Sequence, residues 1–203
     1  MSLRAKAGFG IAFIAVAGAA ACVALVLWNG FSAREQPTAI EAFVARHLRR
    51  LAIPQGAREA MNPIPVTPEI LADARAHFAD HCAICHANDG SGKTDIGKSL
   101  YPKAPDMREP NTQSLSDGEL FYIIRNGIRF TGMPAWGSGD PAEDRGSWEL
   151  VHFIRHLPHL TQDELAEMRT LNPRRQQDVR AEEEAEKFLL GEDAEPASPR
   201  HHH

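Results

Sequence analysis

Cysteine is scarce in this sequence. Only three of its 203 residues are cysteines, and two of these, Cys82 and Cys85, stand close together in one short run. A protein stabilised by disulfides needs several cysteines that can pair across the fold. No disulfide framework can therefore be read from the sequence, and a small fold held together by bridges is excluded.

Positive charge is scarce outside the N-terminal region. Residues 1–66 contain seven Lys and Arg against three Asp and Glu, residues 67–158 nine against thirteen, and residues 159–203 six against eleven. No sizeable basic surface remains after residue 66, so we expect no nucleic-acid partner.

Charge is absent altogether from residues 7–33, which follow Arg4 and Lys6. About 20 apolar residues in a helix span the ~30 Å hydrocarbon core of a bilayer, and Trp28 falls where an interfacial aromatic residue would sit. We therefore predict a transmembrane anchor over residues 1–33 that contacts membrane lipid. The positive flank predicts a cytoplasmic N-terminus with the rest of the chain outside.

Processing of this segment is the alternative to an uncleaved anchor. Ala19-Ala20-Ala21 resembles the cleavage site of a signal peptide, although the chain stays apolar well beyond it. The same residues with Cys22 faintly resemble a bacterial lipobox, but a lipoprotein normally turns polar after its cysteine. We favour the anchor, with Cys22 as a small residue that packs in a membrane helix.

Residues 34–66 are predicted to connect the anchor to the next domain. Residues 41–51 make a short amphipathic helix, which would lie either on anionic lipid headgroups or in solvent as a connector. Its two sides are formed by Phe43, Val44, His47, Leu48 and Leu51 and, opposite them, by Arg46, Arg49 and Arg50. Residues 62–68 contain three prolines and predict an extended linker.

The most informative run is His81-Cys82-Ala83-Ile84-Cys85-His86. It contains C-x-x-C-H, the signal for covalent attachment of haem c. Thr67 as N-cap and Pro68 open a helix that leads into it, and in that helix Cys82 and Cys85 project from one face toward the two vinyl groups of one porphyrin. His86 then sits beside them, able to meet the iron. The apolar stripe that carries the cysteines to the buried side consists of Leu71, Ala74 and Phe78.

Three other interpretations of this run stay open at this point. A zinc site would use Cys82, Cys85, His81 and His86, but four ligands on neighbouring turns do not easily form a tetrahedron. A redox dithiol needs a strand and a βαβ context that the sequence does not indicate, and a structural disulfide needs an oxidising compartment. A nucleotide site at Gly92-Lys93-Thr94 is disfavoured because the preceding residues do not match a phosphate-binding loop.

Two more helices and a loop methionine follow the motif. Ser116-Asp117-Gly118-Glu119 is a capping box that starts a helix, and Asn126-Gly127 ends it. Met133 lies on a loop and off any helical stripe, which weakens its interpretation as a core residue. A helix over residues 147–157 presents an apolar stripe that we expect to pack against the helix beginning at Thr67.

Residues 159–203 form a charged tail. A capping box at Thr161-Gln162-Asp163-Glu164 predicts one helix, residues 174–190 predict another, and the chain from Gly191 onward is polar enough to be disordered. The terminal His201, His202 and His203 would suit a transition metal, but they equally fit a remnant of a purification tag.

The order of these signals over residues 67–158 resembles the class I c-type cytochromes. The resemblance rests on a helix leading into C-x-x-C-H, a glycine loop, the run from Tyr101 to Met107, a capped helix, Gly132-Met133-Pro134 and a closing helix from Trp148 to Leu157. It implies an all-α, cytochrome c-like domain around one covalently attached haem c. The single transmembrane helix predicted before this domain is not part of the family's minimal fold and suggests a membrane-tethered member.

The resemblance also implies roles for particular residues. Cys82 and Cys85 would be the thioether attachment points, with His86 and Met133 as the axial iron ligands. Met107, in the proline-bearing loop, is the rival to Met133. The carbonyl group of Pro102 or Pro105 would accept the Nδ1 hydrogen of His86, which would orient the imidazole ring.

We therefore expect an electron carrier rather than an enzyme, held at the bacterial inner membrane with its haem domain in the periplasm. It would carry single electrons between respiratory or dehydrogenase partners. One alternative is a subunit that docks or assembles a larger respiratory complex through residues 41–51 and the acidic tail. Another is a ligand-binding haem sensor or enzyme, which requires that Met133 is not an iron ligand.

Overall fold

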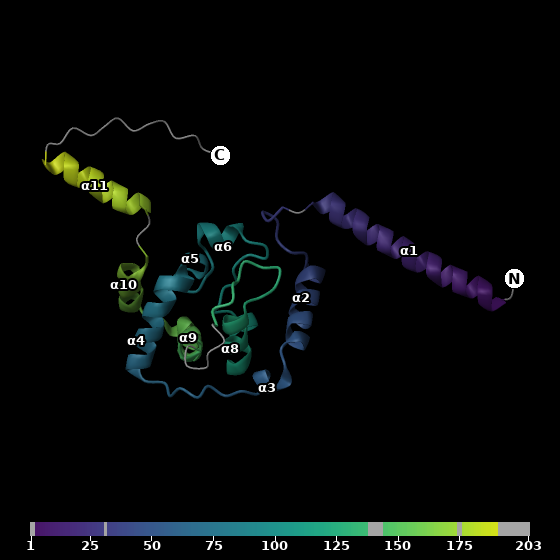
Figure 1. The fold of residues 1–203 in the computed structure, drawn as a ribbon, viewed down its shortest axis with the longest axis horizontal. Coiled ribbons are helices and arrows are strands. Elements are labelled where there is room, and N and C mark those ends of the chain that lie inside the picture. Colours follow the sequence, from purple (N-terminus) through teal and green to yellow (C-terminus); the bar gives the residue numbers. More distant parts are fainter. Residues whose placement is uncertain (1–2, 31, 138–143, 174–175, 191–203) are drawn as a thin grey trace.

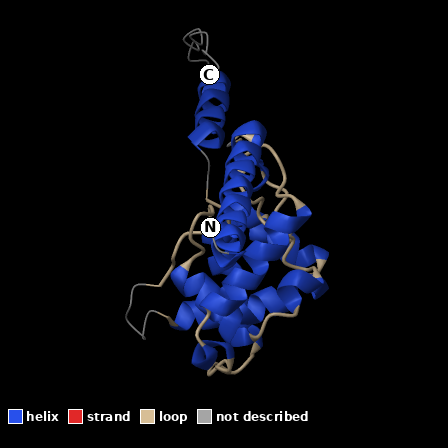
Figure 2. Cartoon of the chain, turned by 90° about the vertical axis from the view of Figure 1, so that its right-hand side faces the viewer, coloured by secondary structure: helices blue, strands red, loops and turns tan. Residues whose placement is uncertain are grey.

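The described part of the chain is helical throughout. The computed structural model describes residues 3–30, 32–137, 144–173 and 176–190, and these residues contain no strand (Figure 2). The elements are, in chain order, α1 (Leu3–Asn29), α2 (Ala39–Ala52), α3 (Gln55–Arg58), α4 (Pro68–His77), the π-helical turn η1 (Phe78–Cys82), α5 (Ala83–His86), α6 (Asp95–Ser99), α7 (Pro110–Gln113), α8 (Asp117–Asn126), α9 (Arg145–His156), the 3₁₀ turn η2 (Leu157–His159), α10 (Gln162–Leu171) and α11 (Gln176–Leu190). The all-α prediction is confirmed.

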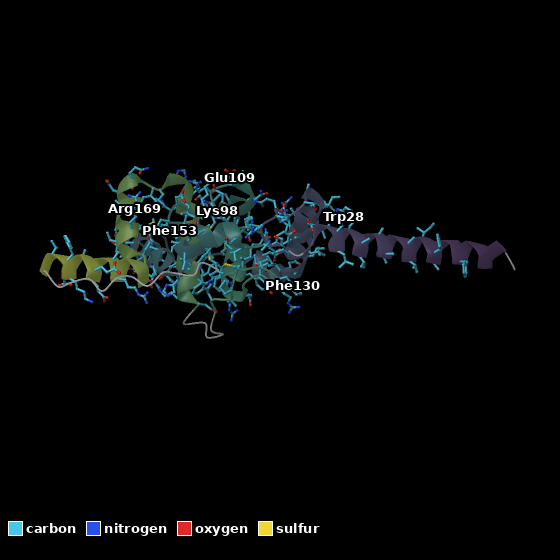
Figure 3. All side chains as sticks on the ribbon, turned by 90° about the horizontal axis from the view of Figure 1, so that it is seen from above. Trp28, Lys98, Glu109, Phe130, Phe153 and Arg169 are labelled. Carbon is cyan, nitrogen blue, oxygen red and sulfur yellow. The ribbon has the colours of Figure 1, made fainter. Side chains whose placement is uncertain are left out.

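Helix α1 projects away from the other helices (Figure 1). Its stretch Gly8–Leu25 is long and apolar enough to cross a membrane, and none of that stretch is buried against the rest of the chain. In Figure 3 the labelled Trp28 lies on this isolated helix, whereas Phe153 lies within the helical body. The N-terminal apolar helix therefore fits a single-pass membrane anchor.

The core lies between α4, α8 and α9. Phe78, which directly follows α4 as the first residue of η1, packs against Phe153 of α9, with ring centroids 5.0 Å apart, and both side chains are almost fully buried. The predicted pairing of these two helices is confirmed. The other buried apolar side chains of this core are Ala74, Ala79, Ala83, Met107, Leu115, Leu120, Ile124, Leu150, Val151, Ile154, Leu157 and Met168.

Local signals set the helix ends as predicted. The Thr67 hydroxyl accepts a hydrogen bond from the Ile70 amide at the start of α4, and α8 begins with a complete capping box between Ser116 and Glu119. Gly127, with a φ of 65°, ends α8 in the left-handed region that glycine tolerates. The closing helix begins slightly earlier than expected, at Arg145.

The acidic tail starts as part of the folded body. Helix α10 opens with the predicted capping box, and its Met168 is fully buried. The Asn172 side chain donates to the Ala79 carbonyl oxygen at 2.8 Å, and Arg75 pairs with Glu164 at 3.0 Å. Helix α11 covers the described part of the other predicted tail helix. The segment expected to be disordered, with His201, His202 and His203, lies outside the described residues.

Residues 34–66 also contact the helical body. Ile53 is only 2% exposed, and the Ser116 hydroxyl donates to the Arg58 carbonyl oxygen at 2.7 Å. A side chain at Gly118 of α8 would overlap the Ala57 carbonyl oxygen, so the lack of one lets α3 approach closely. The proline-containing linker is held in turn on α9 by hydrogen bonds between Asn62 and the Trp148 carbonyl and between His152 and the Ile64 carbonyl.

Helix α2 turns two of its three arginines toward the helical body, although none of its residues is buried. Arg46 and Arg49 line a cavity of the helical body, while the opposite apolar side chains are 45–78% exposed, namely Ile40, Phe43, Val44, Leu48 and Leu51. This is the reverse of an ordinary surface helix of a soluble protein. Contact of this apolar side with lipid headgroups stays a prediction, as do the domain boundaries at residues 33, 66 and 158.

Candidate functional site

The C-x-x-C-H residues lie on the wall of one cavity. Cys82 ends the π-helical turn η1, and Cys85 and His86 complete the short helix α5. All three side chains are half-buried and line a cavity of about 680 Å³. A pocket of ~300–1,000 Å³ is typical of small-molecule and cofactor sites.

The π-helical turn is a feature that the sequence did not reveal. It widens the helix over Phe78–Cys82, up to and including the first cysteine of the motif, and such turns are frequent at functional sites. The apolar spacing before the motif fits a continuous α-helix equally well, so periodicity carried no signal for it.

The glycine loop after the motif binds the backbone of the motif. The Gly92 amide donates to the His86 carbonyl oxygen at 2.8 Å, and the Thr94 hydroxyl donates to the Cys85 carbonyl oxygen at 3.1 Å. Gly97 packs so closely that a side chain there would overlap the same Cys85 carbonyl. Because the glycine loop holds these carbonyl groups, the side chains of Cys85 and His86 stay directed to the cavity.

The His86 side chain is in the neutral form that a metal ligand requires. Burial lowers the pKa of its imidazole to about 4, so the ring is uncharged at neutral pH, which is the form that binds a metal. Its Nδ1 is buried and has no hydrogen-bond partner in the described part of the chain. The hydrogen bond expected from this nitrogen to Pro102 or Pro105 is therefore not formed, although both prolines line the cavity.

The two cysteines are unsuited to act as free thiolates. Burial, and secondarily the neighbouring Cys85, raises the pKa of the Cys82 thiol to about 12, and burial also raises the pKa of Cys85. Reactive and metal-binding cysteines need a lowered pKa. Thioether bonds have no ionisable proton, so this environment fits covalent attachment better than dithiol chemistry.

The zinc and disulfide interpretations find no support in the geometry. Cys82 and Cys85 are both free cysteines. Across the described residues, no group of three or more His, Cys, Asp or Glu side chains is arranged to hold a metal ion. His81 is exposed at the cavity rim, where it pairs with Asp80 at 3.1 Å.

The structure brings both candidate methionines to the cavity. Met133 is half-buried on its loop, where its amide donates to the Thr131 hydroxyl oxygen at 3.1 Å and its carbonyl oxygen accepts the Ile128 amide at 3.1 Å. Met107 is 8% exposed and belongs to the core cluster. Both line the same cavity as His86, so the choice between them as iron ligand stays a prediction.

The arginines of α2 are the site residues that sequence reasoning missed. Glu41, Arg46 and Arg49 line the same cavity as the motif, and α2 stands beside the loops that close it (Figure 1). In the sequence these residues were only the polar side of an amphipathic helix. The one available signal was the pairing of a cationic and an apolar face, which does not say which face turns inward.

The lining as a whole fits a large, flat, apolar group attached at one edge. Most of it is aliphatic or aromatic, and it includes Phe78, Leu100, Ile124, Leu150 and Ile154. The two cysteines, His86, the two methionines, and Arg46 and Arg49 of α2 all contribute to this lining.

Comparison with known families agrees with this geometry. Residues 69–154 match the family described as cytochrome C oxidase, cbb3-type, subunit III. The matched segment includes C-x-x-C-H, both methionines and most of α9, and it excludes α1, α2 and α3. No curated protein gives a significant match.

Proposed function

We propose that this chain, whose residues 69–154 form a class I c-type cytochrome domain that binds covalently attached haem c, is a membrane-anchored carrier of single electrons. Cys82 and Cys85 would form the thioether bonds, and His86 and Met133 would be the axial ligands. The observation that carries the proposal is that all four side chains line one largely apolar cavity.

Each residue contributes a distinct physical property. The buried, neutral His86 offers a ring nitrogen without first losing a proton. The Met133 sulfur is a soft ligand that favours reduced iron and so raises the reduction potential. The chemistry that haem c supplies there when bound is one-electron oxidation and reduction at iron.

The apolar wall lowers the local dielectric and excludes water from the centre. With two protein ligands on the iron, no position is left for a substrate, and transfer of an electron needs no catalytic acid or base. The cytochrome c domain accordingly indicates electron transfer rather than catalysis.

The ligand assignment is tested with two methionine variants of the full-length holoprotein. In Met133→Ala we expect the reduction potential to fall, the absorption band of methionine-ligated ferric haem to vanish and the reduced form to bind CO. Met107→Ala is the matched control, since its side chain lines the same cavity from the core. It should lose stability but keep the band.

The opposite pattern, with the band lost only in Met107→Ala, would make Met107 the iron ligand and Met133 the packing residue. Rapid binding of CO by the reduced wild-type protein would reject the carrier and favour a ligand-binding sensor or enzyme. A wild-type protein whose haem is removed by denaturing extraction would reject covalent attachment at Cys82 and Cys85.

A second function, as a haem c subunit of a larger respiratory complex, is favoured by the description of the matched family. A single membrane-anchoring helix and a helical tail outside the core would suit docking to other subunits. Copurification of a stoichiometric complex from detergent-solubilised membranes would support it, and reversible reduction of a free monomer in those membranes would argue for the mobile carrier.

The periplasmic location belongs to the same proposal. It is supported by the positive flank before α1 and by the need for covalent haem attachment outside the cytoplasm. We expect Lys98, whose side chain is exposed, to react with a membrane-impermeant amine reagent in intact spheroplasts. Labelling of Lys98 only after the membrane is broken would reverse the topology.

A further inference from the structure

Helix α2 forms one wall of the haem cavity although it lies outside the matched segment. Its cavity side consists of Glu41, Ala42, Ala45, Arg46 and Arg49. The two alanines let the helix backbone approach the cavity, and the longer side chains flank them. The residues on the opposite side are exposed and apolar, so burial of apolar surface does not explain why this side faces inward.

Arg49 is the residue whose environment is incomplete. Its Nε is buried and has no hydrogen-bond partner among the residues described. Burial, the largest influence, lowers the pKa of its guanidinium, and the charge of Glu119 acts in the opposite direction. A buried guanidinium nitrogen without an acceptor is unfavourable, so the site calls for an anion at this point.

The nearby carboxylates are occupied elsewhere. Glu119 accepts the Ser116 amide at 2.8 Å in the capping box of α8, and Glu41 accepts the Thr38 amide at 2.7 Å in that of α2. Lys103, which also lines the cavity, donates to the carbonyl oxygens of Ala33 and Arg34 at 2.7 and 3.0 Å. Lys103 thus connects the chain before α2 to the cavity rim. Arg49 is therefore the cation that is available to bind an anion in the cavity.

We propose that Arg49, with Arg46 beside it, binds a propionate carboxylate of the haem. Haem c carries two such groups at the edge opposite its attachment points, and the planar guanidinium matches a carboxylate with paired hydrogen bonds. Helix α2 would then complete the haem site from outside the cytochrome c domain. This inference rests on the proposed function, since it requires haem in this cavity.

The arrangement has an electrical consequence. A cation held near the iron disfavours the additional positive charge of the oxidised state, and it neutralises a propionate that would otherwise stabilise that state. Arg49 therefore raises the reduction potential. Loss of its charge should shift the equilibrium constant for reduction several-fold toward the oxidised form, where a tenfold change corresponds to about 59 mV for a one-electron couple.

The test is potentiometric titration of the full-length holoprotein with three variants. Arg49→Gln should lower the potential, and Arg49→Lys, which keeps the charge but loses the planar fork, should lower it less. Arg50→Gln is the matched control, because Arg50 is exposed on the same helix and does not line the cavity. Resonance Raman spectra provide a second measurement, in which the propionate bending band should shift only for the Arg49 variants.

Two results would overturn the inference. One is an unchanged potential and propionate band in Arg49→Gln, with haem covalently attached and the methionine absorption band intact. The other is an equal shift in Arg50→Gln, which would indicate an effect of net charge alone. Should Arg49→Gln fail to fold, the Raman comparison of Arg49→Lys with wild type decides. Absence of covalent haem in the wild type would instead reject the proposed function itself.

Discussion

The haem domain and helix α2 turn opposite kinds of side chain toward the interior. Between α4 and α9 the inward residues are apolar, as shown by Phe78 and Phe153, which are 1% and 0% exposed. On α2 the inward residues include Arg46 and Arg49, and the apolar side faces outward. The domain is thus held by its own apolar contacts, whereas the position of α2 depends on polar contacts and on what fills the cavity.

The largest expected effect is a difference in stability between variants of the haem domain and variants of helix α2. Phe153→Ala removes a fully buried ring and should lower the free energy of unfolding by ~3–5 kcal/mol. Phe43→Ala, the matched variant on α2, removes a ring that is 55% exposed and should change it by less than ~0.5 kcal/mol. Urea unfolding in detergent measures both. Equal losses of unfolding free energy in the two variants would mean that other residues or detergent bury the outer side of α2.

A smaller effect is expected where the two regions meet. Gly118→Ala places a methyl group against the Ala57 carbonyl oxygen and should cost ~1–3 kcal/mol as the backbone shifts. Because the displaced partner is α3, we expect faster tryptic cleavage after Arg49, Arg50 or Arg58. Gly56→Ala is the control, since its methyl group meets open space, and an equal cleavage rate in the two variants would show that α3 does not depend on this contact.

The smallest effect concerns an ion pair in the loops beside the motif. Arg108 donates to Asp106 at 2.8 and 2.6 Å, and this hydrogen bonding lowers the pKa of the Asp106 carboxyl. The pair therefore stabilises the fold above the unfolded pKa of ~3.9, and the stabilisation is lost as the pH falls through the lower folded value.

Since both side chains are partly exposed, we expect Arg108→Gln to cost less than ~1 kcal/mol at pH 7. The cost should be smaller at about pH 3, below the unfolded pKa of ~3.9, because the carboxyl group loses its charge as the pH falls through its lower folded pKa. Thermal unfolding at the two pH values measures it, with Arg169→Gln, which changes an exposed arginine on α10, as the control. A cost that persists unchanged in acid would assign the effect to packing of the Arg108 stem.

Much of the domain was predictable because its signals are local. Thr67, Ser116 and Thr161 each cap a helix through a hydrogen bond to an amide three residues later, and such bonds depend on a few neighbouring residues only. The motif at Cys82, Cys85 and His86 is equally local. The pairing of α4 with α9 followed from two apolar stripes that had to cover one another.

The candidate site was predictable only in part. Met107 and Met133 both reach the cavity, and the sequence distinguishes them by their loops without showing where those loops lie. The expected hydrogen bond from His86 to a proline carbonyl is not formed, because its geometry depends on how a loop tens of residues away approaches the ring.

The sequence by itself determined the chemistry of attachment, the helical class and the apolar N-terminal segment, since each follows from residue types and spacings within one turn or one membrane span. Tertiary structure decided that α2 turns its arginines toward the motif. An amphipathic helix has two faces that satisfy its local rules equally. The segments on either side of α2 contact the helical body through Ile53, Gly118 and Lys103, and these tertiary contacts select the face that lines the cavity.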